Sequence, residues 1–327
     1  MGPIMEWDHR QIDQFIERQK GSKADSTITN YQSALRRFEQ YINEYDIDIE
    51  TISGRDMDVF VGQLEGDLAE STAAQYIGNI SVFYDWLLMD ADTKNPVNKA
   101  NPDLDGSATT HAKPTLTTDQ LRDLVDSAGT SRGKALLSLM ASTGMRLAEA
   151  CNSKLSKLDL EEREIKIDTV KTDFGERTVY FDRKTRRLLD TYINDRYRLK
   201  YNDPDSDYIF IASNTNQYKV REQEDAAENG VEIDNANIST DVGRRIFMRA
   251  LEESNIDIEY ETYSDGRKRS IYTSHILRRS FCQSWIDNNG DIMSLRNIVG
   301  WENLETAKNY IDDTTSIDKR DRYGITL

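Results

Sequence analysis

A segment rich in helix-breaking dipeptides, between residues 91 and 114, divides the chain into two regions of regular hydrophobic pattern. Its breakers are Asn95-Pro96, Asn101-Pro102, Asp105-Gly106 and Lys113-Pro114. Proline and glycine at this density interrupt helices and strands alike, so a chain of 327 residues with such a break is expected to fold as two domains. We therefore predict a helical domain at residues 1–92, a linker at 93–114 and a second domain at 115–327.

The first region repeats apolar residues at the spacing of one helical face. The stripes are formed by Ile12, Phe15 and Ile16; by Tyr31, Leu35, Phe38, Tyr41 and Ile42; by Met57, Val61 and Leu64; and by Tyr76, Ile80, Phe83, Tyr84 and Leu87. Capping residues precede two of these stripes, at Ser26-Thr27 and at Ser71-Thr72. The patterns predict helices joined by polar linkers, and we expect the aromatic residues to lie in the core rather than on a base-stacking surface.

The second region combines helical patterns with one pair of strands. Helical spacing is found at residues 119–128, 132–143, 183–199, 241–254, 276–288 and 291–299. Two short strands are predicted at Glu164–Val170 and Arg177–Phe181, joined by a hairpin loop that contains Gly175. Residues 214–240 are polar and rich in Asn, Asp and Glu, which predicts a flexible insertion. The predicted fold class is therefore mainly α with a small β-sheet.

Composition excludes several classes of protein. No apolar run reaches the ~18 residues of a membrane span, and the N-terminus lacks the basic and apolar stretches of a secretory signal. Cys151 and Cys282 lie 131 positions apart and outside any Cys/His cluster, so we predict neither a disulfide framework nor a zinc site. These features favour a protein of a reducing cytoplasm.

The formal net charge of −16 is unusual for a protein that binds nucleic acid, because such proteins usually carry a basic surface. In molar salt, however, the Debye length falls to ~3 Å, and an acidic, well-hydrated surface keeps a protein soluble. We therefore hypothesise a salt-loving source; the alternative is an ordinary acidic protein with local basic patches. The first hundred residues hold 9 basic and 18 acidic residues and the remainder 33 and 40, so the second region is less acidic per residue.

Five features of the second region carry groups suited to chemistry on a phosphate. They are Thr143-Gly144-Met145-Arg146-Leu147-Ala148-Glu149, the hairpin residue Lys171, the pair His275 and Arg278, the dipeptide Gly300-Trp301, and Tyr310. His275 and Arg278 are three positions apart, about one helical turn, so they are expected to share a helix face. Taken singly, each feature has a commoner structural explanation as a solvated surface charge, a packing residue or an amphipathic surface tyrosine.

Taken in order, these features resemble the tyrosine recombinase, or phage integrase, family. TGMRLAE resembles the family's TGLRxxE box, HILRRSF its HxLRHTF box, and IVGWENLETAKNYI its LLGHxxxxTTxxY box. The separations from His275 to Trp301 and from Trp301 to Tyr310, 26 and 9 positions, are also typical of the family. KTDFGERTV resembles the strand pair that carries the family's catalytic lysine, and residues 1–92 resemble its helical, SAM-like core-binding domain. The resemblance covers nearly the whole chain.

The sequence departs from the family pattern at three motif positions. Trp301 stands where most members have His, although some active members carry Trp there. Ile276 replaces the commoner Asp, and Arg279 the commoner His. The insertion at 214–240 is longer than in compact members. These departures concern the tuning of the reaction rather than its class.

The resemblance implies a set of catalytic residues: Arg146, Glu149, Lys171, His275, Arg278, Trp301 and Tyr310. Arg146 and Arg278 would clamp the scissile phosphate, since guanidinium groups fork onto two phosphate oxygens and stay protonated. Glu149 would orient these cations.

Four further roles follow from the same resemblance. Tyr310 would be the nucleophile and Lys171 the general acid on the departing 5′ oxygen. His275 would donate a hydrogen bond or handle protons, and Trp301 could give an indole N–H to a phosphate oxygen. The product would be a 3′-phosphotyrosyl enzyme with a free 5′ hydroxyl, and the covalent link would conserve the bond energy, so we expect no metal, ATP or other cofactor.

The partner implied by the resemblance is double-stranded DNA at attachment sites, bound mostly through phosphates. Candidate contacts are Arg36 and Arg37, the cluster from Arg183 to Arg187, Arg244 and Arg245, and Arg267 to Arg269. The working form would be a homo-tetramer on DNA, and a monomer or weak oligomer in free solution. The tail after Tyr310 would dock on a neighbouring subunit or fold back on its own. With the acidic composition, the resemblance favours a haloarchaeal virus, provirus or plasmid as the source.

Three alternatives remain open at this point. The same constellation serves relaxases of the topoisomerase IB kind, although the core-binding region and short C-terminal tail favour recombination. A non-catalytic DNA-binding protein of the same fold is a second alternative, and an acidic scaffold unrelated to DNA is a third.

Overall fold

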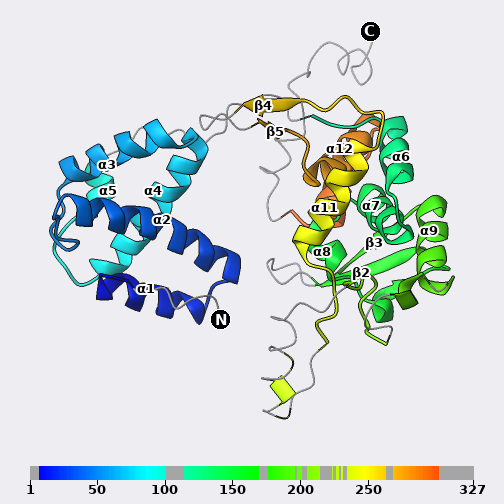
Figure 1. Ribbon diagram of the computed structural model, residues 1–327, viewed down its shortest axis with the longest axis horizontal. Helices are drawn as coiled ribbons and strands as arrows, with labels where there is room; N and C mark the ends of the chain where they lie inside the picture. Colours follow the sequence, from blue (N-terminus) through cyan, green and yellow to red (C-terminus); the bar gives the residue numbers. More distant parts are fainter. Residues whose placement is uncertain are drawn as a thin grey trace, which may run out of the picture. The chain divides into compact units, whose positions relative to one another are not determined.

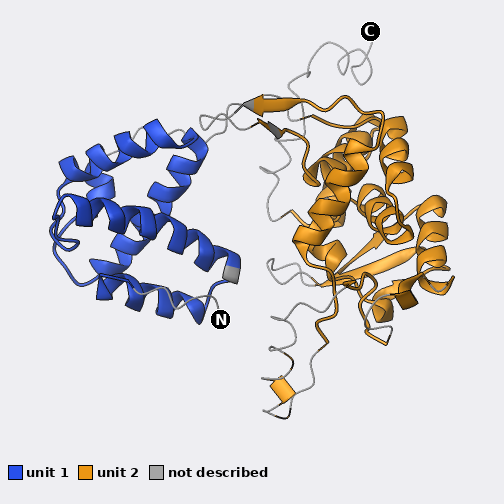
Figure 2. Cartoon of the chain, in the orientation of Figure 1, with its two compact units in different colours: residues 1–111, 262–267 blue, residues 112–261, 268–327 orange. Residues whose placement is uncertain are grey.

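The computed structural model divides the chain into two compact units (Figures 1 and 2). Unit 1 consists of residues 1–111 with 262–267, and unit 2 of residues 112–261 with 268–327. The structure describes residues 7–100, 114–168, 176–195, 197–200, 205–213, 223, 226–227, 230, 234–262 and 268–301. None of the helices in these ranges has the length and apolar character needed to cross a bilayer.

Unit 1 is helical around an aromatic core. Its helices are α1 (Arg10–Lys20), α2 (Asp25–Glu44), α3 (Gly54–Asp67), α4 (Glu70–Leu87) and α5 (Pro96–Ala100). Phe38 meets Phe60 edge-on with ring centroids 5.3 Å apart, and Phe15 meets Phe83 edge-on at 5.5 Å. All four rings are buried, and edge-to-face contacts of this kind stabilise a core beyond the area they bury. The expectation that the aromatic stripe residues are core residues is confirmed for Phe15, Phe38 and Phe83.

Helix α5 lies inside the segment where the breaker pattern predicts a linker. Proline is well suited to the first position of a helix, because the N–H it lacks would have no helical partner there. Asn95 completes the start: its Oδ1 accepts a hydrogen bond from the backbone N of Val97 at 3.0 Å, and its Nδ2 donates to Asp85 at 2.7 Å. Pro96 and Val97 are buried. The dipeptide Asn95-Pro96 therefore starts a helix here, and residues 101–113 of the predicted linker lie outside the described residues.

Unit 2 is built around the buried helix α7 (Ser131–Thr143), which packs against α6 (Thr118–Ser127), α9 (Arg183–Asn194) and α12 (His275–Asp287). The described part of the unit also contains α8 (Leu147–Cys151), α11 (Thr240–Glu252) and α13 (Ile292–Val299), with short 3-10 turns η1 (Leu155–Lys157) and η2 (Arg198–Lys200). Helix α9 ends at Asn194 and is therefore shorter than the helix predicted at residues 183–199. The fold class predicted from the sequence, mainly α with a small sheet, is confirmed.

A small antiparallel sheet packs beside these helices, with strand order β1, β2, β3. The strands are β1 (Leu158–Asp159), β2 (Glu164–Asp168) and β3 (Glu176–Tyr180), and a separate pair is formed by β4 (Tyr260–Thr262) and β5 (Lys268–Ser270). In the register of β2 and β3, Ile165 pairs with Val179 and Ile167 with Arg177. All four side chains are buried, so an arginine occupies a position on the inner, apolar face of the sheet.

The chain on either side of residues 214–233 is held together by hydrogen bonds. The backbone N of Ala212 donates to the carbonyl of Ala236 at 2.9 Å, and the N of Ile238 to the carbonyl of Phe210 at 2.9 Å. The Asp234 carboxylate accepts from the Ser206 hydroxyl and from the backbone N of Asp207, both at 2.9 Å. We call these contacts the paired neck. Most of the insertion predicted at 214–240 lies outside the described residues.

Candidate active site

The turn between α7 and α8 presents Arg146. Helix α7 ends at Thr143 and is capped by Gly144, whose φ of 65° lies in the left-handed region that glycine tolerates best. A Cβ at this position would also come within 2.5 Å of a ring carbon of Phe281. Met145 is buried, and Arg146 then stands at the N-cap position of α8. The glycine thus lets the chain turn sharply and place an arginine at the start of the next helix.

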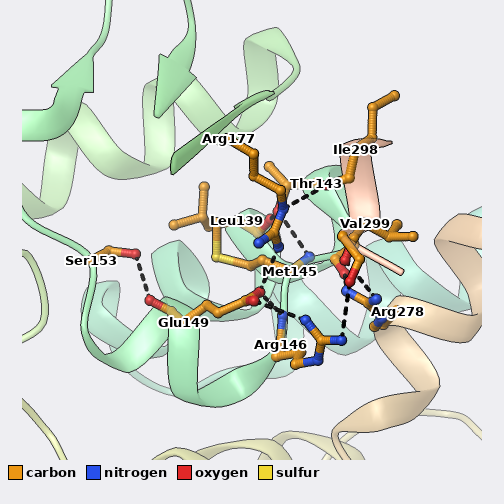
Figure 3. Close-up of polar contacts among 12 residues, drawn as sticks. Leu139, Thr143, Met145, Arg146, Glu149, Ser153, Arg177, Arg278, Ile298 and Val299 are labelled. Carbon is orange, nitrogen blue, oxygen red and sulfur yellow. Dashed lines mark hydrogen bonds and ion pairs between the residues drawn. The ribbon is translucent and has the colours of Figure 1, made fainter. Parts of the chain in front are cut away.

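Glu149 holds Arg146 through both its backbone and its side chain (Figure 3). One carboxylate oxygen accepts from the backbone N of Arg146 at 2.7 Å, and the other accepts from its Nη1 at 3.0 Å. The Arg146 side chain remains 40% exposed, whereas that of Glu149 is 11% exposed. Arg146 therefore has a solvent-accessible guanidinium, and its backbone N and Nη1 are held by a largely buried carboxylate.

Arg177 reaches the same carboxylate from β3 and is not among the site residues predicted from the sequence. Its Nη2 donates to Glu149 at 2.8 Å, and its Nε donates to the carbonyl of Ile298 at 2.9 Å (Figure 3). The side chain is only 7% exposed. A signal was present in the sequence: strand alternation puts position 177 on the same face as Val179, and a charge on an inward face needs a partner.

Opposing effects act on the carboxyl of Glu149. Burial acts to raise its pKa, because a low-dielectric surrounding disfavours the charged form. The hydrogen bond and positive charge of Arg177, together with the backbone N–H and charge of Arg146, outweigh burial and lower the pKa below its ordinary value. Glu149 is therefore an ionised carboxylate at neutral pH.

Arg278 lies deep in the site on α12. Its Nη1 donates to the carbonyl of Gly144 at 2.8 Å and its Nη2 to the carbonyl of Val299 at 2.7 Å, and the residue is 2% exposed. His275, one turn earlier, is the first residue of α12 and is exposed. The two residues thus follow each other along one helix, with the histidine at its solvent end and the arginine in the interior.

The C-terminal end of α13 is where the arginines meet. Helix ends leave carbonyl oxygens without helical partners and carry a partial negative charge, which favours cations. Three consecutive carbonyls each accept from an arginine: Ile298 from Arg177, Val299 from Arg278, and Gly300 from Arg146 at 3.4 Å. We call these oxygens the α13 carbonyl cluster. Gly300 has a φ of 67°, so this end of the helix is closed by a left-handed glycine.

Two matches to known families cover most of the chain. Residues 114–316 match the phage integrase family, and residues 12–90 match the N-terminal SAM-like domain of phage integrases. The chain belongs to the phage integrase family.

Individual phage integrase relatives match along most of the chain. Tyrosine recombinase XerC of Lactobacillus delbrueckii subsp. bulgaricus is 24% identical over 312 residues, covering 91% of this chain and 92% of the relative. The Tn1549 transposon integrase in complex with transposon right end DNA shares the fold, with a TM-score of 0.66, 17% identity, and coverage of 96% and 98%. A lambda integrase tetramer bound to a Holliday junction also has a TM-score of 0.66, at 15% identity and 94% and 78% coverage. The predicted enzyme class, tyrosine recombinase, is confirmed.

The structure describes the positions of some of the family's motif residues but not of all seven. Arg146, Glu149 and Arg278 come together at the end of α13, as described above, and His275 lies on α12. Lys171 and Tyr310 fall outside the described residues, so the positions of the predicted general acid and nucleophile are not among those described here.

Trp301 is almost fully buried next to the site. It packs in an apolar cluster with Cys282, Leu295 and Val299, and it is 2% exposed. Its backbone N donates to the carbonyl of Arg296 at 3.1 Å, and Arg296 Nε donates back to the Trp301 carbonyl at 3.2 Å. The tryptophan at the position of the family's usual histidine therefore anchors the chain just beyond α13.

Four of the arginines considered as DNA contacts pair with acidic neighbours. The pairs are Arg36 with Glu39, Arg37 with Asp67, Arg186 with Glu161, and Arg244 with Asp241. Glu39 is buried, whereas the other three pairs are exposed on both sides, and exposed ion pairs contribute little free energy. A phosphate could therefore replace the carboxylates of these three exposed pairs at low cost.

Proposed function

We propose that this protein is a site-specific DNA recombinase, an integrase, that cleaves and rejoins DNA strands through a 3′-phosphotyrosyl intermediate at Tyr310. The observation that carries the proposal is the convergence of Arg146 and Arg278, 132 positions apart in sequence, on the α13 carbonyl cluster. Phosphodiester cleavage needs such cations, because negative charge builds up on the non-bridging oxygens in the transition state. Two preorganised guanidinium groups are suited to that charge.

The proposed clamp depends on Glu149. As an ionised carboxylate it bonds the backbone and the guanidinium of Arg146, and so limits the directions in which that side chain can point. Its burial strengthens these bonds, since charges interact more strongly away from water. Arg146 keeps exposed surface for a substrate phosphate, and Arg278 forms the inner wall of the site.

The chemical step requires two proton transfers: the Tyr310 hydroxyl loses a proton and the departing 5′ oxygen gains one. The Tyr310 hydroxyl oxygen attacks phosphorus and forms the 3′-phosphotyrosyl bond, while the bond to the 5′ oxygen breaks. Lys171 gives a proton to that departing oxygen, and His275 takes part in handling the phenolic proton. The buried ring of Trp301 packs beside the end of α13. Attack by a 5′ hydroxyl from the partner strand reverses the step on a new strand, so neither ATP nor a metal ion is required.

We propose double-stranded DNA attachment sites as the substrate and a tetramer as the assembly that exchanges strands. Support comes from the matched fold of lambda integrase, whose structure is a tetramer bound to a Holliday junction. In free solution we expect a monomer or weak oligomer. Gel filtration with and without DNA measures this directly.

Trapping the covalent intermediate tests the proposed function. The protein is mixed with a suicide DNA that carries the attachment site, in molar KCl without divalent metal, and the products are separated in SDS. We expect an SDS-resistant protein–DNA band that disappears in Tyr310→Phe and persists in Tyr323→Phe, the matched control within the same C-terminal segment. No band from a protein that still binds the verified site would favour the non-catalytic alternative. Relaxation of supercoiled DNA without strand exchange between two sites would favour the topoisomerase alternative.

We further propose that the reaction takes place at high salt, in a haloarchaeal virus, provirus or plasmid. The net charge of −16 supports this, because molar salt screens the repulsion between an acidic surface and DNA. The counterion-release contribution to binding shrinks under the same conditions. Binding should then weaken less steeply with added KCl than for a basic family member. Maximum cleavage at low salt would contradict the proposal.

A further inference from the structure

We propose that Arg177 is a positioning residue for strand cleavage: it fixes Glu149 against the end of α13 and through Glu149 orients Arg146. It is not one of the seven motif residues, and it does not act on the phosphate itself. The inference rests on the proposed recombinase function.

The Arg177 guanidinium forks between two helices. From β3, Nε bonds the carbonyl of Ile298 on α13 at 2.9 Å while Nη2 bonds Glu149 on α8 at 2.8 Å (Figure 3). The guanidinium is planar, so these two bonds set the distance and angle between a backbone atom of one helix and a carboxylate of another. A lysine ammonium is a single point donor and cannot impose both directions at once.

Arg177 also approaches Gly300 closely. A Cβ at Gly300 would lie 3.2 Å from both Cζ and Nη1 of Arg177. The guanidinium therefore packs directly against the backbone of Gly300, whose carbonyl accepts from Arg146. Arg177 thus contacts both groups that hold the Arg146 guanidinium, the Glu149 carboxylate and the Gly300 backbone.

Arg177 also affects the charge state of Glu149. Among the described residues, the charged groups that act on the Glu149 carboxylate are Arg146 from α8 and Arg177 from β3. Arg146 is 40% exposed and partly screened by water, whereas Arg177 is 7% exposed. Charges interact more strongly in the less solvated position, so Arg177 is the main reason that this carboxylate stays ionised despite its burial. A protonated Glu149 would lose acceptor capacity for Arg146.

The test compares Arg177→Met and Arg177→Lys with the wild type for DNA affinity and for the rate of covalent-complex formation at saturating suicide DNA. We expect Arg177→Met to slow cleavage about 100-fold, the scale of a misplaced catalytic group, with DNA affinity changed less than about threefold. Arg177→Lys retains the charge but not the fork, so it should recover only part of the rate. A rate equal to wild type in either variant would overturn the inference.

The pH dependence separates positioning from a merely structural role. Loss of the Arg177 charge raises the pKa of Glu149, and the active form needs the ionised carboxylate. The cleavage rate of Arg177→Met should therefore fall, as pH is lowered, at a higher pH than that of the wild type or Arg177→Lys. Adding Glu149→Gln to Arg177→Met should remove this difference. Unchanged profiles would overturn the inference.

A measurement without DNA keeps this inference separate from the proposed function. Carboxyl 13C NMR of the folded protein follows the titration of Glu149 directly. We expect a higher pKa in Arg177→Met than in the wild type, and a value near wild type in Arg177→Lys. A missing covalent band in the wild type would contradict the recombinase function alone, whereas an unchanged Glu149 titration would contradict the role of Arg177.

Discussion

Glu39 in unit 1 and Glu149 in unit 2 are both carboxylates withdrawn from solvent, but their hydrogen bonds connect different elements. Glu39 accepts from the backbone N of Asp8 at 2.8 Å and of His9 at 3.1 Å, and from Arg36 on its own helix at 3.0 Å. These contacts fix the start of α1 against α2. Glu149 accepts from one backbone N, that of Arg146, and from the guanidinium groups of two arginines, of which Arg177 also bonds the end of α13.

Burial of a carboxylate therefore does not by itself indicate a functional site. At Glu39 the bonds end within the helical unit, and the Arg36 guanidinium packs 4.1 Å from the centre of the Trp7 ring. Glu149, in contrast, bonds both a buried cation, Arg177, and an exposed cation, Arg146. We therefore expect loss of Glu39 to lower stability and loss of Glu149 to lower activity.

The largest expected effect is on cleavage by Glu149→Ala. Without the carboxylate, Arg146 loses its side-chain anchor and Arg177 becomes a buried charge with one partner fewer. We expect the rate of covalent-complex formation to fall at least about 100-fold, while DNA affinity changes little. Single-turnover cleavage and a DNA-binding titration measure the two quantities. Equal losses in both would place Glu149 in binding rather than in cleavage.

The next effect is on stability, in Glu39→Ala. Two backbone N–H groups and Arg36 lose their acceptor, and we expect the free energy of unfolding to fall by about 2–3 kcal/mol. The midpoint of urea or thermal unfolding measures the loss. Cleavage at saturating DNA, below the unfolding transition, should match the wild type; a selective loss of cleavage would remove the contrast between the two glutamates.

A smaller effect concerns acid stability. Because the folded state lowers the pKa of Glu149 below its ordinary 4.5, the ionised carboxylate contributes stability that is complete above pH 4.5 and lost as pH falls through the folded pKa. Glu149→Gln should therefore be less stable than the wild type near neutral pH and approach it in acid. Urea unfolding at pH 7 and at about pH 3 gives the two differences, and a constant difference would mean that Glu149 is not ionised in the fold.

The smallest effect is expected at an exposed ion pair. Arg122 and Asp119 pair on α6 at 2.8 Å with side chains 63% and 90% exposed. Arg122→Ala should change the free energy of unfolding by less than about 0.5 kcal/mol and leave cleavage unchanged. The variant is thus a reference for loss of a charge outside both buried clusters, and a larger effect would show that exposed pairs matter in this acidic protein.

Much of the helical structure could be predicted from hydrophobic spacing, because positions such as Phe15, Phe38 and Leu136 face their cores at the helical period. Helix α5 was missed because Asn95-Pro96 indicates a break unless its Asn side chain caps the following turn. That cap depends on contacts with α4, which local sequence does not reveal.

The site divides in a similar way. The motif residues Arg146, Glu149 and Arg278 were predicted through family resemblance rather than from spacing alone. Arg177 was missed, and the α13 carbonyl cluster could not have been found, because every residue has a carbonyl and only tertiary structure shows which ones an arginine meets. Alternation along β3 gave the one local signal, an arginine on an inward face.

The paired neck has a consequence for how this chain can change over evolution. Its hydrogen bonds bring the chain before residue 214 and after residue 233 side by side, so unit 2 already closes at that point. The entropic cost of closing a loop grows only slowly with loop length, by roughly 0.6 kcal/mol for each doubling. Lineages can therefore lengthen, shorten or exchange this stretch at little cost to the fold, and a reporter peptide inserted there should leave the arginines at α13 in place.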